Sequence, residues 1–241
     1  MFDLYAEDLA WVHHEGFGQF ALKAAPWIIR NLRGAGFESG RIVDLGCGSG
    51  LLARELTAAG YEVFGIDGSA AMVELARTVA PEAAFEVGTA AGSTLPPCQA
   101  IVALGEVLAY APAGEGGRES LGRFLARARQ ALPPGGLLLF DLLIRGREKL
   151  AHRDWTEGPD WAVLIDVDES DEEFLVRTIT TYRRIGESFR RSRETHLVRI
   201  FERKEVVRAL RLAGFDFRTG RGYGKALLPR RRLAFHARRR G

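Results

Sequence analysis

The chain has 241 residues, of which 46% are hydrophobic and 27% charged, with a net charge of +3. These values are ordinary for a globular protein and exclude global disorder and a collagen-like structure. Cys47 and Cys98 are too few for a disulfide framework or a dedicated zinc site, so we expect no metal. No apolar run approaches the ~18 residues of a membrane helix, and the first residues are not a secretory signal. We therefore expect a soluble cytoplasmic protein without a membrane partner.

The first half of the chain alternates between helical and extended patterns. Residues 5–33 carry apolar side chains at three- and four-residue steps, which predicts two helices separated near Gly16 and Gly18. The next expected elements are strand 41–45, helix 51–59, strand 61–66, helix 69–79, strand 84–87, strand 100–104, helix 120–132 and strand 137–143. This alternation predicts an α/β fold whose parallel sheet is covered by helices on both faces.

The second half of the chain changes character. Residues 161–168, 173–182 and 189–200 alternate polar and apolar positions and are joined by short turns, which is typical of an antiparallel meander. A helix over 202–213 and a strand pair over 215–219 and 233–237 are expected to follow. The antiparallel strands are therefore predicted as an insertion in an otherwise alternating domain.

The strongest signal for a ligand is the segment VDLGCGSG, at residues 43–50. Gly46, Gly48 and Gly50 allow a sharp turn between strand and helix and a close approach of a ligand to the backbone. The helix that follows directs its free N–H groups to the same place, which suits a carboxylate or a phosphate. A dinucleotide fingerprint needs its third glycine three positions after the second, where this chain has Leu51. The spacing therefore disfavours NAD and FAD.

This turn resembles motif I of the class I S-adenosylmethionine-dependent methyltransferases. Asp67 at the end of the second strand, the turn LPPGG at 132–136 and the stretch from His196 to Phe215 are similar to further parts of the family pattern. The resemblance implies a Rossmann-like, mostly parallel sheet of seven strands with an antiparallel strand insertion. It also implies S-adenosylmethionine as the methyl donor and S-adenosylhomocysteine as the product.

The resemblance divides the chain into four parts. These are an N-terminal helical lid (1–34), a core that binds S-adenosylmethionine (35–150), an antiparallel insertion that faces the substrate (151–200) and a C-terminal completion of the core sheet (201–241).

The resemblance also implies a set of cofactor-binding residues. Asp44 is expected to help fix the amino group of the cofactor, Asp67 to hold the ribose, and Thr89 and Ala90 to contact the adenine. Glu106 is expected at the boundary between donor and acceptor. The full set is Asp44, Gly46, Cys47, Gly48, Gly50, Asp67, Gly68, Thr89, Ala90 and Glu106. The family often has an acid where this chain has Thr89, and a neutral contact contributes less than a charged one.

No catalytic triad is visible, and methyl transfer from a sulfonium mainly requires alignment and exclusion of water. The catalytic residue therefore stays unassigned, with His14, Tyr110 and His196 as candidates. Several other positions are open to a pocket role or to a surface, core or capping role: His13, Tyr5, Trp11, Phe17, Arg199 and Asp141. Cys47 is interpreted as a small filler of the glycine turn, and the acidic cluster at 166–173 as a solvated hairpin.

The predicted function is methyl transfer to an oxygen or nitrogen of a small-molecule acceptor, by a monomer or a homodimer. The segment LGEVLAY at 104–110 lacks the Asn/Asp-Pro-Pro-aromatic motif typical of enzymes that methylate adenine, glutamine or cytosine amines. The arginines at 230–232 and 238–240 motivate an alternative, an RNA or protein methyltransferase. Nucleic acid is not favoured as a partner, because these arginines are interpreted as a solvated strand edge and a frayed tail. A non-catalytic subunit that binds S-adenosylmethionine and a nicotinamide oxidoreductase are further alternatives.

Overall fold

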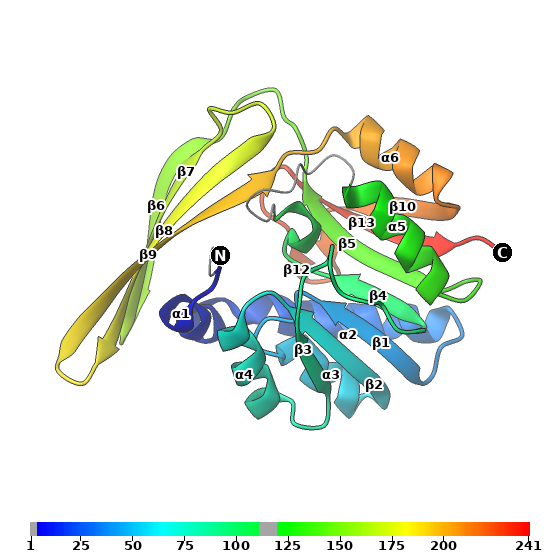
Figure 1. Cartoon of the computed structure of the whole chain (residues 1–241), viewed down its shortest axis with the longest axis horizontal. Coiled ribbons are helices and arrows are strands. Elements are labelled where there is room, and N and C mark those ends of the chain that lie inside the picture. The colour runs from blue at the N-terminus through cyan, green and yellow to red at the C-terminus, as the bar shows by residue number, and fades with distance from the viewer. Residues whose placement is uncertain (1–3, 111–119) are drawn as a thin grey trace.

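The computed structural model describes residues 4–110 and 120–241 and is built around one large sheet. The strands of this sheet are β1 (Gly40–Leu45), β2 (Tyr61–Asp67), β3 (Ala84–Val87), β4 (Ala100–Ala103), β5 (Leu137–Leu143), β10 (Phe215–Gly220) and β13 (Arg232–Arg239). They lie in the order β10–β13–β5–β4–β1–β2–β3, with β1 to β5 parallel and β13 antiparallel to both of its neighbours (Figure 1). The predicted α/β class and the Rossmann-like, mostly parallel sheet of seven strands are confirmed.

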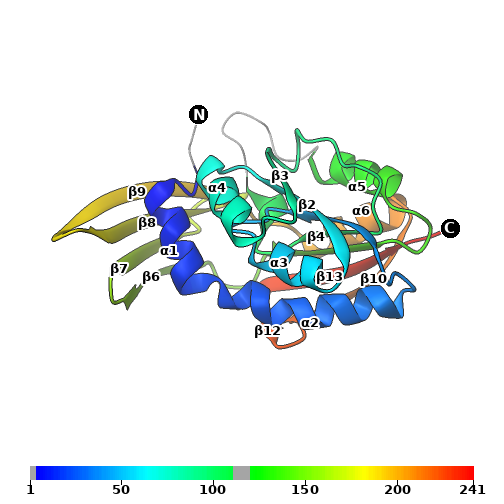
Figure 2. The ribbon, with the colours of Figure 1, turned by 90° about the horizontal axis from the view of Figure 1, so that it is seen from below.

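Helices cover both faces of this sheet because successive side chains of a buried strand point to opposite sides. The helices are α1 (Glu7–Phe17), α2 (Gln19–Gly34), α3 (Leu51–Ala58), α4 (Ala70–Val79), α5 (Ser120–Ala131) and α6 (Arg203–Leu212). Ile42 of β1 packs in a cluster with α2 and α3, whereas the next residue, Val43, packs in a cluster with α5 and α6. Figure 2 accordingly shows α2 and α3 on one side of the sheet and α5 and α6 on the other.

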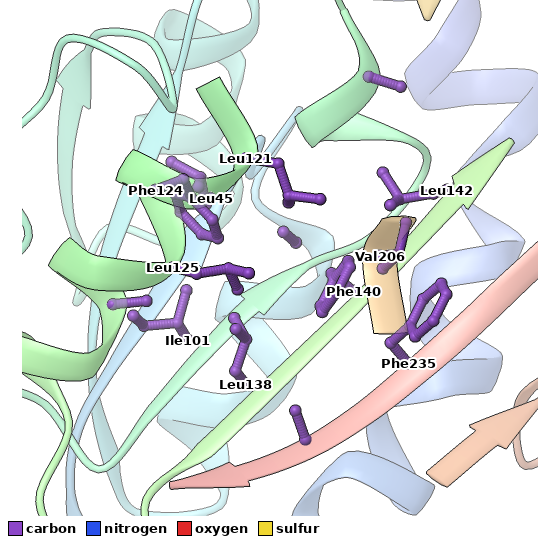
Figure 3. Packing of buried hydrophobic residues seen from close by; sticks show 14 of the residues in the cluster. Leu45, Ile101, Leu121, Phe124, Leu125, Leu138, Phe140, Leu142, Val206 and Phe235 are labelled. Atoms are coloured by element: carbon purple, nitrogen blue, oxygen red, sulfur yellow. The ribbon is translucent and has the colours of Figure 1, made fainter. Parts of the chain in front are cut away.

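Aromatic packing in the core fixes the strands relative to one another. Phe140 of β5 and Phe235 of β13 are fully buried and stack with 5.0 Å between their ring centroids. Ile101 of β4 lies opposite Leu138 of β5 in the sheet, and Leu125 of α5 belongs to the same cluster (Figure 3). Burial of each such side chain contributes about 2–3 kcal/mol. The ends of the central strands, where the glycine turn lies, are therefore held by a rigid layer.

The predicted antiparallel insertion is a separate sheet of four strands beside the core (Figure 1). Its strands, in spatial and chain order, are β6 (Ala151–Gly158), β7 (Trp161–Asp168), β8 (Phe174–Ile185) and β9 (Ser188–Arg199). Val163 and Ile179 on its inner face pack against Leu9 and Val12 of α1. Strand β6 was not expected, because it is an edge strand that is almost wholly exposed and lacks the alternation that marks a half-buried strand.

The interpretation of the C-terminal arginines as a solvated edge and a frayed tail is wrong for their strand and for Arg231 and Arg232, whereas Arg230, Arg238 and Arg240 are exposed. Strand β13 lies inside the sheet, hydrogen-bonded to β10 on one side and β5 on the other. Just before it, Arg231 forms an ion pair with Glu169, and the two side chains are only 8% and 2% exposed. Glu169 therefore departs from the solvated hairpin expected for the acidic cluster, because it pairs with an arginine that is distant in sequence.

Three short elements complete the described chain. Strands β11 (Gly222–Tyr223) and β12 (Ala226–Leu227) form a small ribbon against α2, and a 3-10 turn, η1 (Val107–Ala109), follows β4. Among the helices that the structure describes, none combines the length and the apolar content needed to span a membrane.

Candidate functional site

A cavity of about 780 Å³ opens at the carboxyl ends of β1, β2 and β4, where ligands bind in open α/β sheets. Its volume lies within the range of about 300–1,000 Å³ that is usual for small-molecule sites. Its wall continues onto α1 and onto the inner face of the antiparallel sheet, at residues such as Leu9 and Val163. The predicted cofactor residues on this wall are Asp44, Gly46, Cys47, Gly48, Asp67, Gly68, Thr89 and Ala90. Gly50 and Glu106 are not on it.

The glycine turn brings backbone close to the cavity. The amide groups of Gly46 and Cys47 donate hydrogen bonds of 2.7 and 3.1 Å to Ile66 O, which ties the end of β1 to β2. Gly46 has φ +70°, and a Cβ atom there would lie 2.2 Å from a methyl group of Val107. Gly48 has φ +52°, and a Cβ atom there would meet no atom within 4 Å. Gly46 is therefore required for packing, whereas Gly48 leaves open space at the cavity wall.

The Asp67 carboxylate organises the loops around this turn. One of its oxygens accepts a 2.8 Å hydrogen bond from Gly48 N–H, and the other accepts a 2.9 Å bond from Ser69 N–H. Burial raises the pKa of Asp67, and these two amide hydrogen bonds partly offset the effect. Ser69 in turn caps α4 by accepting from Met72 N–H and donates a 2.6 Å hydrogen bond to Tyr5 O. Asp67 thus connects the glycine turn to α4 and, through Ser69, to the N-terminal segment.

Asp44 is the most isolated acid of the cavity wall. It is only 2% exposed, and its Oδ2 atom has no hydrogen-bond partner among the described residues. Burial, and secondly the charge of Asp67, raise the pKa of Asp44 to about 7. A buried carboxylate oxygen without a donor is costly and needs an explanation. A ligand that brings its own N–H donor to this oxygen would remove the cost.

The loop after β3 is held in place by α5. Thr89 Oγ1 accepts a 3.1 Å hydrogen bond from Gly92 N–H. Arg127 of α5 donates to the carbonyl oxygens of Ser93 and Ala90. Arg127 cannot be predicted from the sequence, because an arginine on an amphipathic helix gives no sign of which loop it will reach. Its role is to present Thr89 and Ala90 to the cavity.

The N-terminal segment is fastened across the cavity by charged and backbone contacts. The amide groups of Tyr5 and Ala6 donate to the two carboxylate oxygens of Glu194 on β9, at 2.7 and 3.0 Å. Arg190 of β9 donates a 2.7 Å hydrogen bond to Asp8 of α1. These contacts join α1 to the antiparallel sheet and close one side of the cavity.

Two tyrosines and two arginines of the cavity wall form a connected cluster. The hydroxyl groups of Tyr5 and Tyr110 are 3.0 Å apart, and Arg177 Nη1 donates to Tyr110 Oη at 3.4 Å. Arg177 and Arg232 both form ion pairs with Glu106, at 3.1 and 2.6 Å. Glu106 itself is fully buried behind the wall. The expectation that Glu106 contacts the cofactor therefore has no direct support from its position.

The three catalytic candidates lie in different surroundings. Tyr110 lines the cavity. His196 is fully buried off the cavity wall, with Nε2 2.9 Å from Glu194. His14 is also off the wall, with Nδ1 2.8 Å from Ser49 Oγ beside the glycine turn. The neighbouring His13 does line the cavity.

The pKa of His13 is lowered to about 4, by burial and secondly by the charge of His14. The His13 imidazole is consequently neutral at physiological pH. It therefore adds no positive charge that would repel a cationic ligand from the wall.

The remaining residues weighed in the sequence analysis divide between structure and cavity wall. Asp141 is buried and accepts hydrogen bonds from Gly105 N–H, Glu106 N–H and the Tyr223 hydroxyl. Burial raises the pKa of Asp141 to about 6. Asp141 thus shapes the turn after β4.

Arg199 lines the cavity and donates to Glu205 at 2.9 Å. Phe17 also lines the cavity, whereas the Trp11 ring packs under Arg183, 4.4 Å from its guanidinium carbon. No group of three or more His, Cys, Asp or Glu side chains suited to a metal ion occurs in residues 4–110 and 120–241.

Comparison with known proteins agrees with this geometry. Residues 42–136 match the model of a family described as a methyltransferase domain. A ubiquinone biosynthesis O-methyltransferase from a Caulobacter species is 30% identical over 122 residues, which are 48% of this chain and 45% of that protein. The chain therefore matches less than half of the length of this curated relative.

Solved structures are similar over nearly the whole chain. An S-adenosylmethionine-dependent methyltransferase from Clostridium acetobutylicum has a TM-score of 0.81 at 15% identity, covering 96% of this chain and 98% of that one. The sugar N-methyltransferase KedS8 from a Streptoalloteichus species has a TM-score of 0.78 at 20% identity, covering 100% of this chain and 94% of that one. At such identities the similarity is one of fold.

Proposed function

We propose that the protein transfers a methyl group from S-adenosylmethionine to an oxygen or nitrogen of a small-molecule acceptor. Residues 42–136 match the methyltransferase-domain model, and the whole chain has the fold of S-adenosylmethionine-dependent methyltransferases. One observation carries the proposal. A single cavity joins the glycine turn and its two acids to residues of α1 and of the antiparallel sheet. It offers walls for two different molecules.

The residues at the glycine turn fit S-adenosylmethionine. Within the described part of the chain Oδ2 of Asp44 has no hydrogen-bond donor, and the ammonium group of the cofactor would supply a charged donor to it. The open space at Gly48 suits the close approach of a ligand to the backbone. Asp67 on the cavity wall suits the ribose hydroxyls, and Thr89 with Ala90 suits the adenine.

When bound, S-adenosylmethionine supplies a methyl group that is already activated on a sulfonium. The chain's own residues then need to bind, orient and exclude water. Asp67, joined by Asp44 in its ionised form, gives the wall at the glycine turn negative character, and neutral His13 does not oppose it. Helix α1, joined to the antiparallel sheet through Leu9 and Val163, covers the cavity and limits the access of water.

The two tyrosines suit the acceptor rather than the cofactor. Arg177 donates to Tyr110 Oη, so the Tyr110 hydrogen is directed either to Tyr5 or to a ligand. Burial, with the neighbouring Tyr110, raises the pKa of Tyr5 well above its ordinary value, so this phenol keeps its proton. These hydroxyls orient an acceptor by hydrogen bonds. We therefore propose Tyr110, of the three catalytic candidates, as the group that touches the acceptor.

The alternatives have less support. Of the C-terminal arginines that motivated an RNA or protein substrate, Arg231 and Arg232 pair within the fold with the buried acids Glu169 and Glu106. A non-catalytic subunit would not need the part of the cavity that extends from the glycine turn to the antiparallel sheet. A nicotinamide enzyme is disfavoured by Leu51, and comparing thermal stabilisation by the two cofactors distinguishes it.

Calorimetry with S-adenosylmethionine and S-adenosylhomocysteine tests the proposal. Both are expected to bind, and Asp67→Ala is expected to weaken S-adenosylmethionine by about 1.5–3 kcal/mol, the range for hydrogen bonds to a charged group. The matched control is Asp216→Ala, an acid of β10 whose side chain is 79% exposed, which should bind as the wild type does. If the wild-type protein binds neither molecule at millimolar concentration, the proposal is overturned.

A further inference from the structure

The acceptor end of the cavity carries two arginines that converge on one buried acid. Arg177 comes from β8, and Arg232 is the first residue of β13, so they reach the cavity from the insertion and from the core sheet. Their Nη2 atoms lie 3.1 and 2.6 Å from the same oxygen, Oε2 of Glu106. The side chains of the arginines are 15% and 22% exposed, whereas that of Glu106 is 1% exposed. The cations therefore face the cavity and the acid lies behind them.

The backbone around Glu106 is built to hold its carboxylate there. Glu106 has φ +64°, a conformation that is uncommon for a residue with a side chain. Both oxygens of the Asp141 carboxylate accept from the amides of Gly105 and Glu106, at 2.9 and 3.0 Å. Asp141 is fully buried and does not line the cavity. Glu106, which pairs with both arginines, and Asp141, which interacts with Arg232, are thus off the wall, and a ligand in the cavity meets the guanidinium groups first.

The arginines retain hydrogen-bonding capacity toward a ligand. A guanidinium has N–H groups on three nitrogens. Arg177 directs Nη1 to Tyr110 and Nη2 to Glu106, and for Arg232 the contact found among the described residues is the one with Glu106. Nε and Nη1 of Arg232 therefore remain for a further acceptor. The planar fork of arginine matches carboxylate and phosphate groups.

The cavity wall also carries apolar side chains. Those from β7, β8 and the segment before β13 are Val163, Ile165, Ile179, Leu227 and Pro229, and Arg199 of β9 is a third arginine on the wall. A ligand that suits such a wall has an apolar body and one charged group. This combination differs from the acidic wall at the glycine turn, where Asp44 and Asp67 lie.

We propose that the acceptor is a small apolar molecule with an oxyanion group, a carboxylate or a phosphate, and that Arg232 and Arg177 bind this group with Glu106 as the positioning residue. The inference rests on the proposed function and names the class of acceptor. A purely structural cluster would tie the insertion to the core sheet just as well. It would not distinguish a charged ligand from a neutral one of the same shape.

The experiment uses the full chain saturated with S-adenosylhomocysteine and three probes of similar shape, benzoate, phenyl phosphate and benzamide. Calorimetric titration is expected to give binding of at least one anion at least tenfold tighter than that of benzamide. The tighter of the two anions identifies a carboxylate or a phosphate as the preferred group. Because this comparison uses the wild-type protein, it does not depend on any variant being folded.

Variants then assign the binding to the arginine pair. Arg232→Gln is expected to weaken the preferred anion at least tenfold, with S-adenosylhomocysteine affinity unchanged. Arg232→Lys keeps the charge but loses the planar fork, so its affinity for the anion should lie between those of the wild type and Arg232→Gln. The matched control is Arg230→Gln in the same segment, whose side chain is 82% exposed, and it should bind the anion as the wild type does.

The outcomes separate the two proposals. If S-adenosylhomocysteine binds but neither anion is preferred over benzamide, the oxyanion site is wrong and the proposed function stands. The same holds if Arg232→Gln binds S-adenosylhomocysteine and the anion as the wild type does. If S-adenosylhomocysteine does not bind to the wild type, the proposed function fails first.

Discussion

Replacing Asp44 with asparagine tests whether this buried acid is kept for a cationic ligand at the expense of stability. Asp44 is 2% exposed, its Oδ2 has no partner among the described residues, and burial with the charge of Asp67 raises its pKa to about 7. In the free protein below pH 7 the carboxyl is therefore mostly protonated. We expect the ammonium group of S-adenosylhomocysteine to require the ionised form, so that binding releases a proton.

The magnitudes follow from the two pKa values. The ordinary value of 3.8 and the folded value of about 7 differ by about 3 pKa units, which is about 4 kcal/mol at about 1.4 kcal/mol per unit. Because the folded pKa is raised, this carboxyl contributes most stability at acid pH, and the contribution is lost as pH rises through about 7. Asp44→Asn should therefore stabilise the ligand-free protein increasingly between about pH 4 and pH 7 and by a constant amount above pH 7, at most about 4 kcal/mol.

Two assays check the reasoning. Calorimetry from pH 5.5 to 8.5 should show the affinity of the wild type for S-adenosylhomocysteine falling about tenfold per pH unit below pH 7 and levelling off above it. Asp44→Asn should bind weakly with no such slope, and urea unfolding should give the stability difference. Asp216→Asn, an exposed exchange of the same kind, should change neither quantity. An affinity independent of pH in the wild type, or a slope that persists in Asp44→Asn, would refute the role of Asp44.

Two further predictions concern the packing around the cavity. Gly46→Ala places a Cβ atom 2.2 Å from Val107 at a positive φ and should lower the free energy of unfolding by about 1–3 kcal/mol. Gly48→Ala places its Cβ atom in open space and should lower it less. Equal urea midpoints for the two variants would contradict the packing argument. Arg231→Met leaves Glu169 buried without its partner and should cost about 3 kcal/mol at neutral pH. Burial alone would raise the pKa of Glu169, but Arg231 holds that pKa below 4.5. The stability lost in Arg231→Met should therefore fade as pH drops through the lowered pKa. A difference in thermal stability between variant and wild type that stays constant from pH 7 to 3 would contradict this prediction.

Local sequence signals predicted most of the fold because they match the physical periods of its elements. Strand 84–87, strand 137–143 and strand 161–168 coincide with β3, β5 and β7. In each case a run of apolar or alternating residues is bounded by turn residues. Strand β6 escaped because its pairing with β7 is the reason it is extended, and its own side chains are solvated. The C-terminal arginines misled for a related reason, since their partners are distant in sequence.

The same distinction separates the two ends of the cavity. The glycine turn and Asp67 are close in sequence to the strands that carry them, so their joint position could be predicted from the order of elements. Arg177, Arg232 and Tyr5 come from three separate parts of the chain and meet only through tertiary packing. No spacing in the sequence relates them. The place of Glu106 after β4 predicts that it lies near the site, but its pairing with the arginines cannot be predicted without knowing where they lie.

The charges of the cavity connect these two ends into one argument about ligands. Asp44 and Asp67 lie on the wall at the glycine turn, whereas Arg177 and Arg232 lie on the wall where Tyr110 and the turn after β4 meet the antiparallel sheet. A cationic donor and an anionic acceptor would each find the complementary end, and each would be repelled from the other. Such an arrangement orders two molecules head to head before any reaction, which lowers the cost of alignment. The buried acid that pairs with the arginines lies behind them, so their guanidinium groups are what a ligand in the cavity meets.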